Sequence, residues 1–296
     1  MRWYANVREV GSGGATVVLA HGYGANQGIW DKLLPALSQS NRVILFDWDF
    51  TGGDAEEEEG RYTFGRFADD LIALLDGKGV RGAVLVGHSM SAMAGCIASA
   101  RRPDLFSHLV LLCASPRYIN SPEEGYVGGF ERAGIDGILE AMSSDFAAWV
   151  KSFVPNAAGD AAAAPLLEES FLAMRPAVAL GLAQMIFLGD QRGVLAAVAA
   201  PCTIVQVEGD FAAPPSVAEY MGRAMAGAAA ADVVIIDSVG HFPQLVAPRQ
   251  VLDVLEGVLR RRRRRRRGSE DGGRGAAVVE PAAEVEASDG GIDITA

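Results

Sequence analysis

The segment Val84–Ala92 constrains the fold of this chain more than any other. It begins with an apolar run typical of a buried strand and continues as Gly87-His88-Ser89-Met90-Ser91. Small residues two before and two after a serine let a strand and the following helix approach closely, which leaves the serine at the apex of the turn. Because Ser91 replaces the more common glycine, an ordinary strand-turn-helix remains an alternative to a nucleophile elbow at Ser89.

Strand-like and helix-like segments alternate on both sides of this turn. Gly11, Gly13 and Gly14 precede a strand instead of following one, so they predict a hairpin turn and not a phosphate-binding loop. Runs that are apolar on both faces are typical of parallel strands, and periodic apolar residues are typical of helices. We expect strands at 15–20, 42–47, 84–87, 109–113, 202–207 and 233–237, and helices at 31–38, 64–76, 90–101 and 250–260. The alternation predicts an α/β fold with a mostly parallel, twisted sheet flanked by helices.

Residues 119–194 interrupt this alternation with helix-like segments that carry many large apolar side chains. We expect a helical cap here, inserted between two parts of a core at 1–118 and 195–260. The apolar residues of such a cap either pack together or line a ligand pocket, since ligand pockets are mostly apolar. The alanine-rich stretch 157–164 is expected to be a loop of little functional weight.

A serine, an acid and a histidine each follow a predicted strand. Ser89 follows 84–87, Asp210 follows 202–207 and His241 follows 233–237, which is the chain order of the α/β-hydrolase triad. In this hypothesis His241 takes the proton of Ser89 and Asp210 fixes the imidazole tautomer. Asp237 is the competing acid, but it lies only four residues before His241, so Asp210 is preferred.

The loop His21-Gly22-Tyr23-Gly24 follows the first apolar run and precedes the elbow, where this fold places half of an oxyanion hole. We expect the backbone N–H groups of Tyr23 and Met90 to form that hole. His88 is expected to pack beneath the turn, and His108 to be exposed. The Cys and His residues lack the spacing of a metal site, so we predict no metal and no cofactor.

Composition restricts the compartment and the partners. Half of the chain is hydrophobic, and its three cysteines, Cys96, Cys113 and Cys202, lie in apolar runs typical of buried thiols in a reducing compartment. Neither a signal peptide nor a membrane span is predicted. The net charge is −11 although Arg260–Arg267 is a run of arginines, so the remainder is acidic and nucleic-acid binding is disfavoured. A cytoplasmic or nuclear location is expected.

The end of the chain has a composition of its own. Arg260–Arg267 is followed by a segment rich in alanine, glycine and acids, and we expect 261–296 to form a tail that is disordered beyond about Arg264. Eight adjacent arginines are either a nuclear localisation signal or a solvated extension without function.

Met90 and the segments Phe46–Trp48, Ile119–Ser121 and His241–Pro243 look closest to the orphan receptor-like paralogue group of the plant strigolactone and karrikin receptor-type α/β-hydrolases. Six segments are similar to that family as a whole. They are Gly87–Met93, Arg102–Phe106, Ala114–Tyr118, Gly129-Phe130, Met174–Pro176 and Gly240–Gln244. The resemblance implies a cap of four helices over a deep apolar pocket and slow cleavage of butenolide ligands. It also implies ligand-dependent contact with an F-box protein and a repressor.

The resemblance further assigns pocket-lining aromatic residues: Tyr23, Phe130, Trp149, Phe153 and Phe187. Tyr23 replaces a phenylalanine common in the family, and its hydroxyl is expected to make the pocket mouth more polar. An ordinary metabolic carboxylesterase, a cofactor-free perhydrolase and a ligand-binding receptor with incidental turnover remain alternatives. Dehalogenases and epoxide hydrolases are disfavoured, because they use an aspartate where this chain has Ser89.

Overall fold

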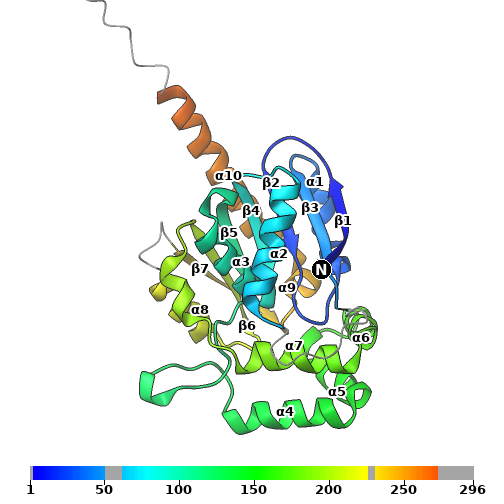
Figure 1. Cartoon of the computed structure of the whole chain (residues 1–296). Helices are drawn as coiled ribbons and strands as arrows, with labels where there is room; N and C mark the ends of the chain where they lie inside the picture. The colour runs from blue at the N-terminus through cyan, green and yellow to red at the C-terminus, as the bar shows by residue number, and fades with distance from the viewer. Residues whose placement is uncertain (1–2, 51–61, 226–230, 273–296) are drawn as a thin grey trace, which may run out of the picture. The chain divides into compact units, whose positions relative to one another are not determined.

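The structure is a computed structural model that describes residues 3–50, 62–225 and 231–272 (Figure 1). It divides into one unit at Met1–Val258 and a second at Leu259–Ala296. The sheet and the cap both belong to the first unit.

The sheet has seven strands in the order β1-β3-β2-β4-β5-β6-β7, and all strand pairs except β1 with β3 are parallel. Each predicted strand is present, which confirms the α/β fold. Because parallel strands end at the same edge, the residues that follow β2, β4, β6 and β7 meet there. The strands are β1 (Tyr4–Val10), β2 (Thr16–Ala20), β3 (Arg42–Trp48), β4 (Ala83–His88), β5 (Phe106–Leu112), β6 (Cys202–Gly209) and β7 (Ala231–Val239).

The expected hairpin at Gly11–Gly14 is wrong. β3 lies between β1 and β2, so these glycines connect strands that are not neighbours. Gly11 and Gly14 have positive φ angles of 73° and 51°, and a Cβ at either would lie within 2.2 Å of the carbonyl oxygen of Ser38 or Ser40. The glycines therefore serve a close crossing over the start of β3, and not a two-strand turn.

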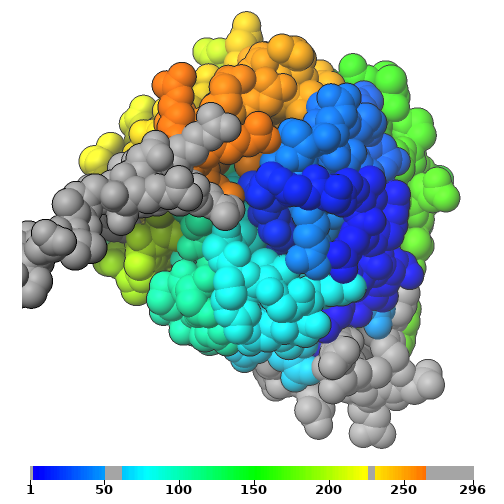
Figure 2. All heavy atoms as spheres, turned by 90° about the horizontal axis from the view of Figure 1, so that it is seen from above, coloured from blue at the N-terminus to red at the C-terminus, as the bar shows by residue number. Residues whose placement is uncertain are grey.

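Helices α2 (Phe64–Gly77) and α3 (Met90–Arg101) lie in front of the sheet in Figure 1, and for α2 the apolar period of 64–76 predicts this position. The segment expected to be helical at 31–38 is helical only from Leu34, after a 3-10 turn at Gln27–Trp30. Viewed from above, blue N-terminal residues and cyan residues of the α2 region form much of this end of the first unit (Figure 2). Outside the cap, the first unit also contains α1 (Leu34–Ser38), α8 (Pro215–Ala224), α9 (Pro243–Val246) and the first part of α10 (Pro248–Gly272).

The cap lies below the sheet in Figure 1. Its helices are α4 (Arg132–Ser144), α5 (Phe146–Ala158), α6 (Ala164–Leu172) and α7 (Pro176–Leu188). Within the described residues, no single helix is both long and apolar enough to cross a membrane, although α6 and α7 together, bent by 110°, reach that length and composition.

The expectation for the alanine-rich stretch 157–164 needs correction. Ala157 and Ala158 are the last residues of α5 and are fully buried, and only the residues between them and Ala164 connect α5 to α6. The backbone carbonyl of Ala157 accepts a hydrogen bond of 2.8 Å from the backbone N–H of His241. This stretch thus joins the cap to a loop of the predicted site.

The arginine run is helical in the structure. Helix α10 continues to Gly272, past Arg264, where disorder was expected to begin, and arginine is itself a good helix former. Residues 273–296 lie outside the described residues, so the expectation of disorder at the end of the chain stays a prediction.

Candidate active site

Ser89 sits on a sharp turn between β4 and α3. Its φ of 52° and ψ of −114° are unusual for a residue with a side chain, and such strain is typical of a functional turn. A Cβ at Gly87 would lie 2.8 Å from Cα of Ala92, so only glycine fits where strand and helix cross. The Ser89 N–H donates to the carbonyl of Leu112 at the end of β5, 2.8 Å away. The turn is an elbow that presents one hydroxyl.

The structure brings together the three residues predicted from the sequence. His241 Nε2 lies 2.9 Å from Ser89 Oγ, and His241 Nδ1 lies 2.8 Å from Asp210 Oδ2. All three side chains are almost buried, which strengthens these hydrogen bonds relative to bonds in water. Asp237, the competing acid, is exposed on β7, and its backbone carbonyl instead accepts a hydrogen bond from Gln250.

The loop after β6 holds Asp210 on both of its carboxylate oxygens. Oδ1 accepts the backbone N–H groups of Ala212 and Ala213 at 2.9 and 3.4 Å. Oδ2 accepts His241 and also Nε2 of Gln206, which lies 2.8 Å away on β6. Gln206 could not be predicted as a site residue, because one polar residue in an apolar run carries no sign of its partner.

The loop that carries His241 is attached to the elbow through His88. His88 Nε2 lies 2.7 Å from the backbone carbonyl of His241, and its ring lies 4.6 Å from that of Phe242. Burial, with the neighbouring His241, holds the pKa of His88 well below its ordinary value, so the ring is neutral and Nε2–H donates. His88 packs beneath the turn, as predicted.

Ser91 attaches the elbow to the loop after β2. Its hydroxyl donates to the carbonyl of His21 and accepts from Nε1 of Trp48 at 2.7 Å. A Cβ at Gly22 would lie 3.1 Å from Cβ of Ser89, so the loop passes directly beside the nucleophile. A glycine at position 91 would lack this hydroxyl and both of its hydrogen bonds. The structure therefore explains why a serine stands at this position.

The predicted oxyanion donors lie on the two segments that Ser91 joins. Met90 is the first residue of α3, where backbone N–H groups have no partner within the helix. Tyr23 follows Gly22 in the loop after β2. His21 stabilises that loop: its Nδ1 lies 2.9 Å from the carbonyl of Gly22, and its Nε2 accepts the backbone N–H of Trp48 at 2.8 Å. Burial lowers the pKa of His21 to about 4, which keeps this neutral arrangement.

Tyr118 is a further residue at the nucleophile to which the sequence analysis gave no role. Its hydroxyl lies 3.5 Å from Ser89 Oγ, and its ring centroid lies 5.2 Å from that of Phe187 and 6.4 Å from that of Phe130. Two of the predicted pocket aromatics therefore gather around a residue that reaches the serine. Burial raises the pKa of the Tyr118 hydroxyl, which stays protonated.

The other predicted pocket aromatics belong to a second cluster. Trp149 and Phe153 stack at 4.6 Å on one face of α5, and both rings meet Phe171, which in turn meets Tyr23 at 5.2 Å. The Tyr23 hydroxyl donates to the carbonyl of Ala179 in α7 at 2.9 Å. The Tyr23 hydroxyl is therefore occupied by a hydrogen bond to the cap. This differs from the expectation that it makes the pocket mouth more polar.

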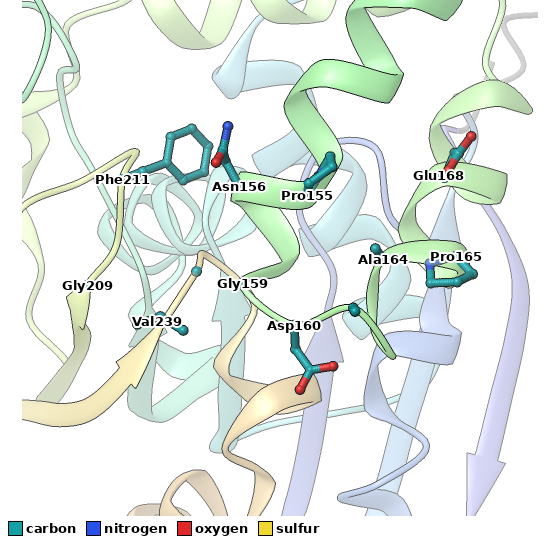
Figure 3. Close-up of a pocket in the computed structure, with 12 residues that line it drawn as sticks. Pro155, Asn156, Gly159, Asp160, Ala164, Pro165, Glu168, Gly209, Phe211 and Val239 are labelled. Atoms are coloured by element: carbon teal, nitrogen blue, oxygen red, sulfur yellow. The ribbon is translucent and has the colours of Figure 1, made fainter.

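An open cavity of about 600 Å³ borders the loops that carry the acid and the histidine (Figure 3). Phe211 and Gly240, the neighbours of Asp210 and His241, line it together with Asn156, Asp160 and Glu168 of the cap. The predicted pocket aromatics are not among the residues of this cavity, so their assignment to a ligand pocket above Ser89 stays a prediction.

Cys113, Asp210 and His241 place three possible metal ligands within 4.8 Å of one another. Burial raises the pKa of the Cys113 thiol, which disfavours the thiolate that a metal would need. Asp210 and His241 are already joined to each other by a hydrogen bond. We therefore assign this group no metal. The three cysteines are free and buried, as predicted. The expectation that His108 is exposed is wrong. The side chain is half-buried, and its Nε2 lies 2.9 Å from Thr203 Oγ1.

Comparison with known proteins agrees with this geometry. Residues 17–254 match the model of the alpha/beta hydrolase family. The chain is 41% identical over 256 residues to Karrikin insensitive 2 receptor CA of Petunia hybrida, covering 84% of this chain and 93% of the relative. It is 40% identical over 259 residues to strigolactone esterase D14 of Arabidopsis thaliana, covering 86% and 96%. This chain belongs to the strigolactone and karrikin receptor-type α/β-hydrolases.

A solved structure supports the same hydrolase fold. The hydrolase olei00960 from Oleispira antarctica superposes with a TM-score of 0.80 at 28% identity, covering 86% of this chain and 94% of that one. The narrower assignment to the orphan receptor-like group stays a prediction.

Proposed function

We propose that this protein is a slow serine hydrolase of the receptor type, which binds a small butenolide and cleaves its lactone or ester bond. The observation that carries the proposal is the unbroken chain of hydrogen bonds from Ser89 through His241 to Asp210, at 2.9 and 2.8 Å. Such a chain lets a histidine accept the serine proton while a carboxylate holds its tautomer.

The proposed reaction is acyl transfer in two steps. As Ser89 Oγ attacks the carbonyl carbon of the ligand, its proton passes to His241 Nε2, and the carbonyl oxygen becomes an oxyanion. The backbone N–H groups of Met90 and Tyr23 are the proposed donors to that oxyanion. His241 then gives its proton to the leaving oxygen, and water, activated by the same ring, cleaves the acyl-enzyme. Slow turnover and the butenolide ligand are inferred from the receptor-type relatives.

The first test uses the purified full chain with a panel of butenolides, following product release and thermal shift together. We expect slow release with wild-type protein, and in Ser89→Ala a retained thermal shift without release. Ser99→Ala is the matched control, because Ser99 is a fully buried serine of α3 whose hydroxyl has no partner among the described residues. Wild-type turnover in Ser89→Ala would contradict the proposed mechanism.

The butenolide panel, measured beside p-nitrophenyl acetate, separates the alternatives. Fast turnover of p-nitrophenyl acetate without any response to butenolides would favour an ordinary carboxylesterase or a perhydrolase. A thermal shift without product release in wild-type protein would favour a receptor whose turnover is incidental.

Signalling partners and location are a further part of the proposal. Kinship with strigolactone and karrikin receptors supports ligand-dependent contact with an F-box protein and a repressor, in the cytoplasm or nucleus. The arginine run offers a test of location: the full chain and a chain truncated after Leu259 are compared in cells. A nuclear fraction that is unchanged by truncation would remove the targeting role of the arginines.

A further inference from the structure

We propose that Gln206 is a positioning residue of the triad: its buried side-chain amide fixes the Asp210 carboxylate against His241. The inference rests on the proposed function, since it assigns the triad acid a second support. Gln206 lies on β6, four residues before Asp210, and is fully buried.

The amide of Gln206 has one possible orientation. Its Nε2 donates to Asp210 Oδ2 at 2.8 Å and to the carbonyl of Ala213 at 2.7 Å. Both partners can only accept when Asp210 is ionised, so the nitrogen and not the oxygen must face them. One amide group therefore holds the carboxylate and the loop that follows it.

The position of this amide carries a cost as well as a gain. Oε1 of Gln206 is buried and has no partner among the described residues. A buried acceptor without a hydrogen bond is unfavourable, and an apolar side chain of similar length would remove it. The two hydrogen bonds of Nε2, one of them to the triad acid, are what offset this cost.

Support from Gln206 acts on the oxygen that His241 uses. Oδ2 of Asp210 accepts both the Gln206 amide and His241 Nδ1, while Oδ1 accepts the backbone of the loop. Without the amide, Oδ2 loses a donor and more of its negative charge falls on His241. A more strongly held proton on His241 then moves the low-pH limb of the rate profile to higher pH.

The surroundings of Asp210 make this limb a clean readout. Among the described residues, His241, Cys113 and Tyr118 are titratable groups that interact with the carboxylate. The ring of His88 lies 5.2 Å from that of His241, and burial holds the pKa of His88 well below its ordinary value. Burial raises the pKa of the Cys113 thiol and of the Tyr118 hydroxyl, so both stay neutral where the low-pH limb is measured. None of Cys113, Tyr118 and His88 therefore changes its charge where the limb is measured.

The experiment measures the acylation rate with p-nitrophenyl acetate from about pH 5 to about pH 9, together with denaturant unfolding, for Gln206→Met in the full chain. We expect an acylation rate about tenfold lower, a low-pH limb about half a pH unit higher and a lower unfolding midpoint, because the hydrogen bonds to the Asp210 carboxylate and to the Ala213 carbonyl are both removed. Gln244→Met is the matched control: Gln244 is also fully buried, and its amide has no partner among the described residues. The acylation rate and the low-pH limb of Gln244→Met should both match those of the wild-type protein.

A second variant keeps the proposal falsifiable if Gln206→Met does not fold. In Gln206→Glu the protonated acid can still donate to Asp210, but the ionised acid repels it. The rate should therefore approach wild type at low pH and fall at high pH. A wild-type profile in either variant, or a loss of stability with an unchanged limb, would overturn the inference. Ser89→Ala separates the two proposals: if it acylates normally the triad fails, whereas if only the Gln206 variants behave as wild type the triad stands.

Discussion

Nε2 of His88 lies 2.7 Å from the backbone carbonyl oxygen of His241, so the residue before the nucleophile holds the loop of the histidine that activates it. His88→Phe keeps a ring but leaves that carbonyl without its donor. We expect a rate several-fold to about tenfold lower and a free energy of unfolding about 1 kcal/mol lower. Hydrolysis kinetics and urea titration measure both. His108→Phe, at a histidine that bonds Thr203, is the control that should leave the rate unchanged; an unchanged rate in His88→Phe would refute this role.

Ser91 provides a test of the elbow that does not touch the nucleophile. The Ser91 hydroxyl joins His21 and Trp48, so both Ser91→Ala and Ser91→Gly should loosen the loop that carries Tyr23. We expect a rate about threefold lower in both variants with at most about 1 kcal/mol lost in stability, because Trp48 Nε1 still bonds the His21 carbonyl. A glycine variant faster than wild type would show that size, and not the hydroxyl, matters at this position.

Gly24 links the loop after β2 to the cap. A Cβ there would lie 2.0 Å from the ring of Phe171, and its φ is 69°. Gly24→Ala should therefore lower the free energy of unfolding by about 2 kcal/mol or more, because the backbone is strained and Phe171 is displaced. Gly79→Ala is the control, because Gly79 has a φ of 62° and nothing within 4 Å of its Cβ position. It should lose about 1 kcal/mol. Equal losses in urea denaturation would contradict a specific contact with Phe171.

Much of this site could be predicted from sequence because it follows the ends of parallel strands. Ser89, Asp210 and His241 each lie after an apolar run, and a parallel sheet brings such positions to one edge. β1 was missed because Tyr4–Val10 is a mixed, largely exposed edge strand without a continuous apolar run.

The supports of the site could not be predicted in the same way. Gln206 and Ala157 act through a buried amide and a backbone carbonyl, whose partners depend on the packing of distant segments. Tyr118 was visible only as part of a family motif, since its 3.5 Å approach to Ser89 depends on the path of the chain after β5. Periodicity reports which faces are buried, but not which polar groups meet within them.

The buried His21 should make stability depend on pH. Burial lowers its pKa to about 4 in the folded protein, whereas the unfolded chain binds a proton near its ordinary value of 6.5. The unfolded state therefore binds more protons between these values, and stability is lost as the pH falls through this window. From pH 7 to pH 5, the free energy of unfolding of His21→Asn should fall by about 2 kcal/mol less than that of the wild-type protein. Urea titrations at the two pH values measure this difference. An equal fall in the free energy of unfolding of wild type and variant would contradict a neutral, buried His21.

The most direct test of the central claim is to locate the covalent intermediate. Wild-type protein is quenched during hydrolysis of p-nitrophenyl acetate, digested and mapped by mass spectrometry, with Ser89→Ala treated in parallel. The proposed mechanism predicts an acetyl group on the peptide that contains Ser89, and none at that site in the variant, which should also release no p-nitrophenol above background. An acetyl group on another side chain that accounts for turnover, or normal release by Ser89→Ala, would contradict it.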